Sequence, residues 1–266
     1  MFKKLAAGML LTWLGMGTAQ ADPFVEAQGE GRIIVSAIHT ESSRSFDRNG
    51  NLSPIPDYDQ NQIYVQAQYG LTDDLTILLT PSFRDVEVAA GNSTSGLGYT
   101  DVGARYRLAH GDDWVVSAQG LVRIPGKKRK DRVVLDGNGA QYDQVWDTVE
   151  YDMRVGAGYS MGPSFVSAEA GYRIREGDPP NEFHADLVVG SHVTPEFMLL
   201  GTLLNTFSDG RGQGMFDRSH RYGDLYVSGV YDLNEHVSFQ AGYTQTIYGK
   251  NALRQRGPFI GLWYKF

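Results

Sequence analysis

Twelve segments of the chain, each 9 to 13 residues long, alternate between apolar and polar side chains. A transmembrane strand tilted in a bilayer needs ~9–11 residues, whereas ordinary globular strands average about 5–6. The period of two places the apolar side chains on one face of each strand, and the charged residues and glycines on the other. The predicted strands span residues 33–42, 61–69, 75–85, 99–109, 114–124, 149–161, 164–175, 183–193, 197–207, 222–231, 237–248 and 257–266.

The connectors between these segments alternate in length. Turns of two to five residues separate one set of neighbours, and connectors of seven to twenty-four residues separate the other set. Outer-membrane barrels combine short periplasmic turns with longer external loops around an apolar exterior and a polar interior. We therefore predict an all-β fold, a single antiparallel up-and-down transmembrane β-barrel of about 12 strands with both termini on the periplasmic side.

A soluble β-sandwich shares this alternation and is the main alternative. Sandwiches connect strands through Greek-key crossings and do not separate long from short connectors so regularly, so the barrel is favoured. The 266 residues include no cysteine, which excludes disulfide scaffolds and thiolate metal sites. The net charge of −7 argues against a nucleic-acid binder.

The first residues have the pattern of an export signal. Lys3 and Lys4 precede an apolar stretch over residues 5–16, and Ala19-Gln20-Ala21 provides the small residues of a cleavage site. The apolar stretch is shorter than the ~20 residues of a spanning helix, which disfavours a membrane anchor. We predict a signal peptide at residues 1–21, a barrel at 22–266, and export to a Gram-negative outer membrane.

The turn Gly162-Pro163 sets the register of its hairpin and pairs opposite charges on the inner face. It places Glu150 opposite Arg175 and Asp152 opposite Arg173, and such pairs stabilise a register by ~0.2–1 kcal/mol each. The inner faces of all strands together hold seven positive and six negative side chains, so we expect no strong preference for anions or cations. The predicted lumen groups are Arg105, Arg107, Glu150, Asp152, Arg154, Glu169, Arg173 and Arg175.

Catalytic and metal-binding patterns are weak. The sequence contains no zinc-protease, serine-hydrolase or nucleotide-binding motif. His184 and Asp186 share an inner face, but Ser191 lies on the opposite face, beyond the reach that a nucleophile needs from its base. Asp57 and Asp59 lack the further oxygen ligands of a calcium site. We therefore predict no enzyme, catalytic residue, metal or cofactor, with a lipid-modifying enzyme as a minor alternative.

A run of basic side chains lies in the connector over residues 125–148. As part of an external loop it would attract lipid phosphates or an acidic polymer at the cell surface. A solvated loop that only neutralises neighbouring phosphates is an equally open interpretation. The basic residues are Lys127, Lys128, Arg129, Lys130 and Arg132.

Two stretches, 69–76 (YGLTDDLT) and 96–106 (GLGYTDVGARY), resemble the barrel proteins grouped with the phenol meta-pathway MetA type. Residues 123–126 (RIPG), 177–179 (GDP) and 251–266 are similar to XagA-like outer-membrane proteins. The aromatic ending of the chain is similar to the signature by which Gram-negative barrels are inserted. The resemblance covers nearly the whole mature chain and implies no catalytic residues. One family name points to uptake of aromatic compounds and the other to exopolysaccharide genes, and the basic run departs from both.

These patterns predict a passive channel or a translocation partner for small molecules or exopolysaccharide, selective through bore width and lumen charge. The alternative is a structural barrel that binds lipopolysaccharide or polysaccharide through the basic run without transport. The expected partners are outer-membrane lipids and lipopolysaccharide, a small-molecule or polysaccharide substrate, and the barrel-assembly machinery acting on the C-terminal strand. Nucleic acid is not expected.

Overall fold

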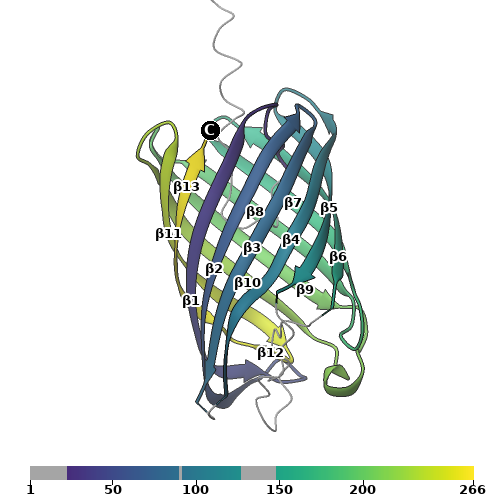
Figure 1. Ribbon diagram of the computed structural model, residues 1–266. Coiled ribbons are helices and arrows are strands. Elements are labelled where there is room, and N and C mark those ends of the chain that lie inside the picture. Colours follow the sequence, from purple (N-terminus) through teal and green to yellow (C-terminus); the bar gives the residue numbers. More distant parts are fainter. Residues whose placement is uncertain (1–22, 90–91, 127–147) are drawn as a thin grey trace, which may run out of the picture.

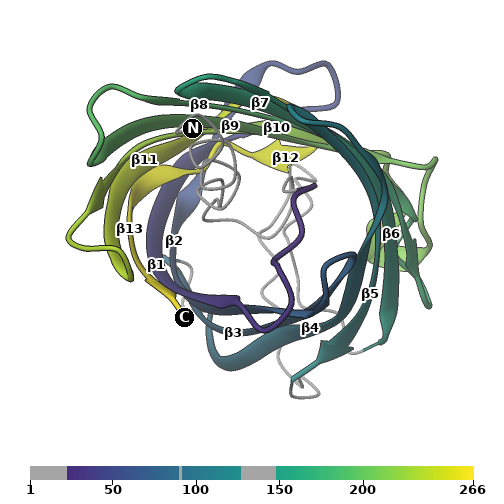
Figure 2. The ribbon, with the colours of Figure 1, turned by 90° about the horizontal axis from the view of Figure 1, so that it is seen from above.

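The protein folds into a closed antiparallel β-barrel. The computed structural model describes residues 23–89, 92–126 and 148–266. Their strands form one sheet in chain order, and β1 closes it by pairing with both β2 and β13. Figure 1 shows the barrel from the side and Figure 2 shows it along its axis. The predicted up-and-down barrel of 12 wall strands is thus confirmed, and β12 is a short additional strand. No described helix is long and apolar enough to cross a membrane.

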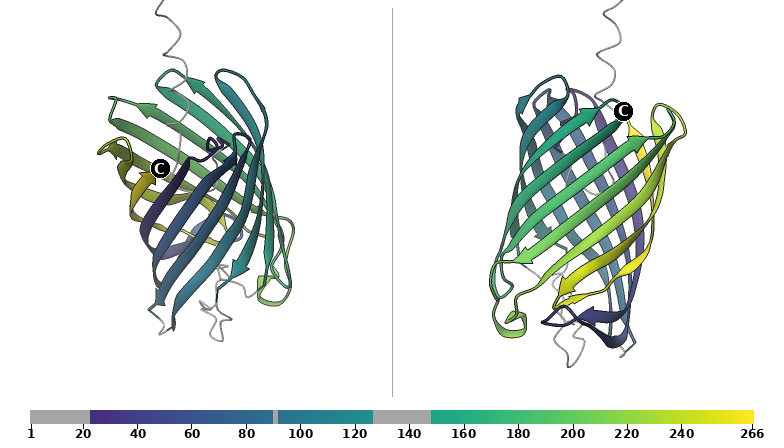
Figure 3. Two further views of the ribbon diagram at one scale, coloured as in Figure 1. Left: turned by 45° about the horizontal axis from the view of Figure 1, so that its top comes forward. Right: turned by 180° about the vertical axis from the view of Figure 1, so that it is seen from behind.

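The wall strands are long and steeply tilted, as the view from behind in Figure 3 shows for β6 to β11. The bounds are β1 (Gly31–Phe46), β2 (Leu52–Thr72), β3 (Leu75–Val88), β4 (Asn92–His110), β5 (Trp114–Pro125), β6 (Glu150–Met161), β7 (Ser164–Arg175), β8 (Glu182–His192), β9 (Phe197–Ser208), β10 (Arg221–Asp232), β11 (Val237–Lys250), β12 (Ala252–Leu253) and β13 (Arg256–Lys265).

The two ends of the barrel differ. The turns that connect β2 to β3, β4 to β5, β6 to β7, β8 to β9 and β10 to β11 lie at one end, together with the start of β1 and the end of β13, where Arg32 pairs with Lys265 (top of Figure 1). We call this the turn end, and the opposite end the loop end. The register predicted for the hairpin around Gly162-Pro163 is confirmed, because Met161 pairs with Ser164 and the ladder continues in register to the far end of β7.

The first two long connectors were predicted too long. β1 continues to Phe46 and β2 begins at Leu52, so the connector expected over 43–60 reduces to a turn at 47–51. β3 and β4 likewise stay paired as far as Val88 and Asn92. In the β3 extension the apolar Val86 and Val88 are buried on the inner face, and the outer face carries Asp85 and Glu87. An apolar outer face, the pattern expected of a membrane strand, therefore does not continue into this extension.

The outer face is apolar along the middle of the wall and aromatic near the turn end. Val155, in the middle of β6, has 54% of its surface exposed. Large exposed apolar side chains in this position contact acyl chains in a membrane, and aromatic girdles mark the membrane interfaces. The exposed aromatic residues at the turn end are Tyr69, Tyr106, Trp114, Tyr159, Tyr231, Phe239, Tyr264 and Phe266.

The inner face is not polar throughout, which corrects the expectation of a uniformly charged or glycine-lined interior. Near the turn end an apolar cluster points inward from β1, β7 to β10 and β13, and we call it the apolar floor. A second apolar cluster at the loop end joins Leu253 of β12 to Tyr58, Val86 and Val88. The apolar floor consists of Ile34, Phe165, Val188, Met198, Leu200, Val230 and Trp263.

Two predictions fall outside the described residues. The signal peptide at residues 1–21 and the basic run Lys127–Arg132 both lie in parts of the chain that the structure does not describe. Both therefore stay predictions from the sequence.

A charge on the outer face of β6 tests which side meets lipid. We expect Val155→Arg to lower the free energy of unfolding by about 2–4 kcal/mol, because an arginine at mid-membrane depth must be buried in hydrocarbon. Unfolding by denaturant in lipid vesicles measures the change. Asn49→Arg, in the turn between β1 and β2, is the control and should leave the value within ~0.5 kcal/mol. Equal effects of the two substitutions would contradict this membrane placement.

Candidate functional site

A cluster of paired charges covers the inner face of β5 to β8, and we call it the ionic wall. Arg175 Nε lies 2.9 Å from Glu150 Oε1, and Arg173 Nη2 lies 2.9 Å from Asp152 Oδ2. Both opposite-charge pairs expected from the hairpin register are therefore present. Arg123 extends the wall by lying 3.1 Å from Glu150 Oε2. The ionic wall consists of Arg123, Glu150, Asp152, Arg154, Glu169, Arg173, Arg175, Glu182 and Asp186.

Arg154 lies at the centre of the ionic wall and joins three carboxylates. Its Nε is 2.6 Å from Asp152 Oδ1, and its Nη1 is 3.0 Å from Glu169 Oε1 and 2.8 Å from Asp186 Oδ2. Glu169 and Asp186 face each other directly across β7 and β8, a placement that would be destabilising for two like charges alone. The guanidinium of Arg154 between them removes that repulsion. Its side chain is only 1% exposed.

Glu182, which the sequence analysis left at the edge of a connector, is a further member of the ionic wall. Its carboxylate lies 2.6 Å from Arg175 Nη1 and 3.2 Å from Arg173 Nη1, and His220 Nε2 lies 3.1 Å from it on another side. Glu182 opens β8 opposite Arg173. The ionic wall thus continues without a break from β5 to the start of β8.

A second wall of the lumen is formed by β1 to β3 and carries amides in place of charge pairs. The inner face of β2 presents glutamines at nearly every second position, a period that could have revealed this wall in the sequence. Gln60 accepts a hydrogen bond from Tyr58 Oη at 2.8 Å and donates to Gln62 at 3.0 Å. Arg84 donates to Tyr58 Oη at 3.0 Å. We call Gln60, Gln62, Gln66 and Gln68 the glutamine ladder.

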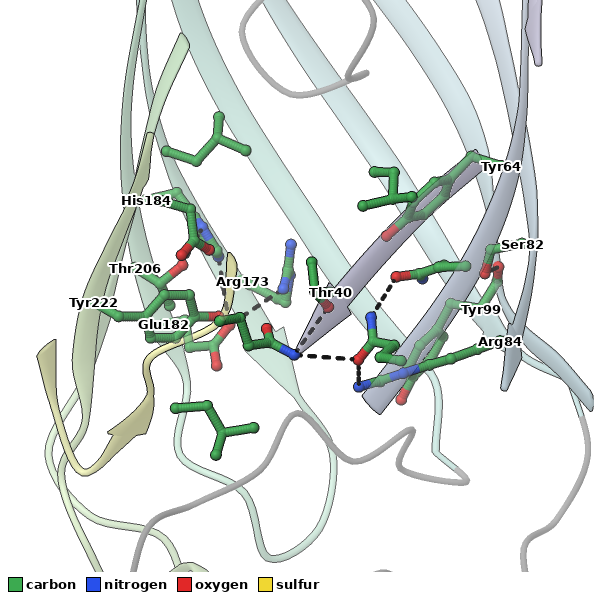
Figure 4. Close-up of a pocket in the computed structure, with 18 of the residues that line it drawn as sticks. Thr40, Tyr64, Ser82, Arg84, Tyr99, Arg173, Glu182, His184, Thr206 and Tyr222 are labelled. Carbon is green, nitrogen blue, oxygen red and sulfur yellow. Dashed lines mark hydrogen bonds and ion pairs between the residues drawn. The ribbon is translucent and has the colours of Figure 1, made fainter. Parts of the chain in front are cut away.

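Between the two walls lies a cavity of about 260 Å³. In Figure 4, Glu182, His184 and Thr206 face Tyr64, Ser82 and Arg84 across it. Of the eight lumen groups predicted from the sequence, Glu150, Arg173 and Arg175 line the cavity. Asp152, Arg154 and Glu169 belong to the ionic wall but do not line the cavity. Arg107 lies at the rim of the turn end, where its Nη2 is 2.7 Å from the half-exposed Asp74.

Residues 23–30 run across the interior at the turn end, and we call them the N-terminal segment (purple, before β1, in Figure 2). Arg105, fully buried, donates from Nη1 to the carbonyl oxygen of Phe24 at 2.8 Å. The ring of Phe24 packs edge-on against Phe165 of the apolar floor, with centroids 6.4 Å apart. Glu26 donates from its backbone nitrogen to Thr76 Oγ1 at 2.8 Å.

Two glycines make room for the N-terminal segment. A Cβ at Gly158 would lie 2.6 Å from the Phe24 ring, and one at Gly70 would lie 2.0 Å from the carbonyl oxygen of Ala27. Both distances are far below van der Waals contact, so the wall is shaped to accept the segment. Arg105, predicted as a lumen group, therefore points inward as expected but is buried against this segment, which the sequence patterns did not predict.

Among the residues that the structure describes, no three His, Asp or Glu side chains are grouped so that they could hold a metal ion. Asp57 and Asp59 belong to no such group. The densely charged interior is therefore built from ion pairs in the described part of the chain.

The family described as "Putative MetA-pathway of phenol degradation" matches residues 57–266. The chain belongs to this family. The family resemblance expected from residues 69–76 and 96–106 is thus confirmed. No curated protein matches the chain in sequence.

The solved structures that this family member resembles are outer-membrane barrels. The COG4313 outer membrane channel from Pseudomonas putida F1 is 16% identical, with a TM-score of 0.73 over 95% of this chain and 100% of that one. The KdgM porin in complex with disordered oligogalacturonate is 8% identical, with a TM-score of 0.53 over 88% and 99% of the two chains. The NanC porin is 10% identical, with a TM-score of 0.52 over 87% and 100%. At these identities the likeness shows the fold.

Removing the charge of Arg154, at the centre of the ionic wall, should destabilise the barrel. We expect Arg154→Met to lower the free energy of unfolding by about 3–5 kcal/mol, because it removes the arginine paired with the buried Glu169 and Asp186 and leaves Asp152 with Arg173 alone. Denaturant unfolding in vesicles provides the value. Arg107→Met is the matched control. It should lower the free energy of unfolding by about 0–1 kcal/mol, because the ion pair between Arg107 and Asp74 is exposed to solvent. A similar loss for both variants would show that Arg154 does not hold the wall together.

Proposed function

We propose that this family member is a passive channel for small solutes in the outer membrane of a Gram-negative bacterium. The observation that carries the proposal is the cavity between the ionic wall and the glutamine ladder, inside a closed barrel with an apolar exterior. Twelve strands enclose more space than the eight-stranded barrels that side chains fill, and less than the water-filled porins of sixteen. The cavity of about 260 Å³ suits a small molecule rather than a polymer.

The pairing of charges supports passive conduction with weak ion selectivity. The cavity is lined by four arginines and four carboxylates. Ion selectivity arises where rings of one charge sign line a pore, and this lining has no such ring. The charged lining residues are Arg84, Arg123, Arg173 and Arg175, and Asp101, Glu150, Glu182 and Asp224.

The N-terminal segment supports a channel that is narrow at the periplasmic end. Short turns face the periplasm in bacterial barrels, which places the turn end and this segment there. The segment is held by the buried Arg105 and by Phe165, so it narrows the route from the cavity to the periplasm. The cavity itself has no lining residue from the segment.

The outer-membrane channels and porins that share this fold agree with the proposal, which includes no catalytic step. We expect lipids and lipopolysaccharide to contact the outer face of the barrel and the basic run. The barrel-assembly machinery is expected to act on the C-terminal strand. The exposed Phe266 supports the contact with the assembly machinery, because its aromatic side chain lies at the turn end with its backbone paired to Gly31.

Planar-bilayer recordings test the channel and its narrow end together. We expect the full mature chain to give small conductance steps, and a variant lacking residues 23–28 to give steps several-fold larger because the turn end is cleared. Heat-modifiable migration on gels confirms that both are folded. If neither protein conducts, the channel proposal is wrong; if both conduct equally, the N-terminal segment does not narrow the pore.

The same recordings test the balance of charge. In a potassium chloride gradient we expect a reversal potential near zero, because arginines and carboxylates line the cavity in equal number. Glu182→Gln leaves the arginines in excess and should shift the reversal potential towards that of an anion-selective pore. A strongly selective wild-type channel would contradict the balanced lining.

A further inference from the structure

Two buried polar atoms at the glutamine ladder lack a partner. Gln66 Oε1 and Ser36 Oγ form no hydrogen bond with any residue that the structure describes. The two side chains are 5% and 3% exposed, and both line the cavity. Ser36 of β1 pairs with Tyr64, so Gln66, two residues further along the same inner face of β2, is the diagonal neighbour of Ser36. Buried polar atoms normally have partners, so these two point to a bound molecule.

The chemistry of this pair is that of a hydroxyl site. An amide oxygen accepts a hydrogen bond, and a serine hydroxyl both donates and accepts. The hydroxyl groups of a ligand can form hydrogen bonds with Gln66 Oε1 and Ser36 Oγ. An apolar ligand would leave these two atoms unsatisfied, at a cost of about 1–3 kcal/mol each.

The rest of this wall is held in place for hydrogen bonding. Gln255 donates from Nε2 to Gln60 Oε1 at 3.4 Å and to Thr40 Oγ1 at 3.5 Å, which ties the ladder to the start of β13. Tyr64 lines the same part of the cavity. Tyrosine faces are electron-rich and attract polarised C–H groups, such as those of a sugar ring. A polyhydroxyl ring presents hydroxyl groups at its edge and C–H groups on its faces. The amides of this wall complement the hydroxyl groups, and the face of Tyr64 complements the C–H groups.

The opposite wall disfavours a charged ligand. Its arginines and carboxylates already satisfy each other, as Glu182 does with Arg175 and Arg173. A bound ion would lose its hydration without gaining an unpaired counter-charge, and that loss is expensive in a partly dry site. An uncharged solute with several hydroxyls does not bear this cost.

We infer that the cavity holds a subsite for an uncharged polyhydroxyl solute of the carbohydrate class, centred on Gln66 and Ser36. The inference rests on the proposed channel and names its substrate class. It separates this chain from a channel for simple aromatic compounds, which one name of the resemblance suggested. The ring hydroxyls bind Gln66 and Ser36, and the ring lies toward Tyr64.

Titration calorimetry on the full mature chain in detergent micelles tests the subsite, with titrations of empty micelles subtracted. The probes are glucose, maltose, glucuronate (the glucose ring with a carboxylate) and phenol. We expect at least one neutral sugar to bind more tightly than glucuronate and phenol. Tighter binding of glucuronate or phenol, or no binding of either sugar, would overturn the inference.

Variants locate the bound sugar. Gln66→Leu and Ser36→Ala should each weaken sugar binding, and the double variant should weaken it about 10-fold or more, as expected for two lost hydrogen bonds. Gln245→Leu is the matched control, because Gln245 pairs with Arg256 on the outer face. Unchanged sugar affinity in the double variant would place the sugar elsewhere and overturn the subsite.

Calorimetry does not depend on conduction, so the two proposals fail separately. A chain that binds maltose but carries no current keeps the subsite and refutes the channel. A chain that conducts but binds neither sugar keeps the channel and refutes the subsite. Heat-modifiable migration on gels shows that each variant is folded.

Discussion

Backbone pairing between β1 and β13 is the constraint on which the rest of the structure depends. Inside a bilayer no water is available to an unpaired amide, and each one costs several kcal/mol. The seam runs from Arg32 and Lys265 at the turn end to Glu41 and Arg256 toward the loop end. Once it closes, the sheet has an outside that meets acyl chains and an inside that does not. A chain of this composition can then place arginines and carboxylates at membrane depth without exposing them to lipid.

The enclosed charges, in turn, give the barrel a firm interior. Each guanidinium of the ionic wall is planar and offers donors in several directions, so one arginine can join carboxylates from different strands. Arg154 does this across β6, β7 and β8. Glu150, Asp152 and Glu182 each contact at least two arginines, so several ion pairs hold each of these carboxylates in place. A wall fastened in this way keeps its shape, and the cavity beside it stays open even though its lining is electrically balanced.

Much of this architecture could be predicted from the sequence, and the missed parts share a cause. The two-residue turn Gly162-Pro163 leaves one sensible register, so the charge pairs of β6 and β7 follow from the chain alone. The stretches of β1 and β2 at the loop end have few apolar residues on the outer face, so the alternation expected of a membrane strand stops there. The N-terminal segment is short and irregular, and its place depends on distant residues such as Arg105 and Gly158. Long-range packing of this kind has no local pattern that sequence reasoning can detect.

The apolar floor makes the two ends of the lumen chemically different. A polar inner face would suffice to line a uniform pore, but here seven apolar side chains gather at the turn end. Apolar surface inside a wet barrel is stable only where something covers it, and Phe24 does so against Phe165. The charged and amide-lined cavity lies toward the loop end, on the far side of that cover. In the channel that we propose, a solute arriving from outside meets hydrogen-bonding groups first and the narrow apolar end last, so binding in the cavity precedes passage to the periplasm.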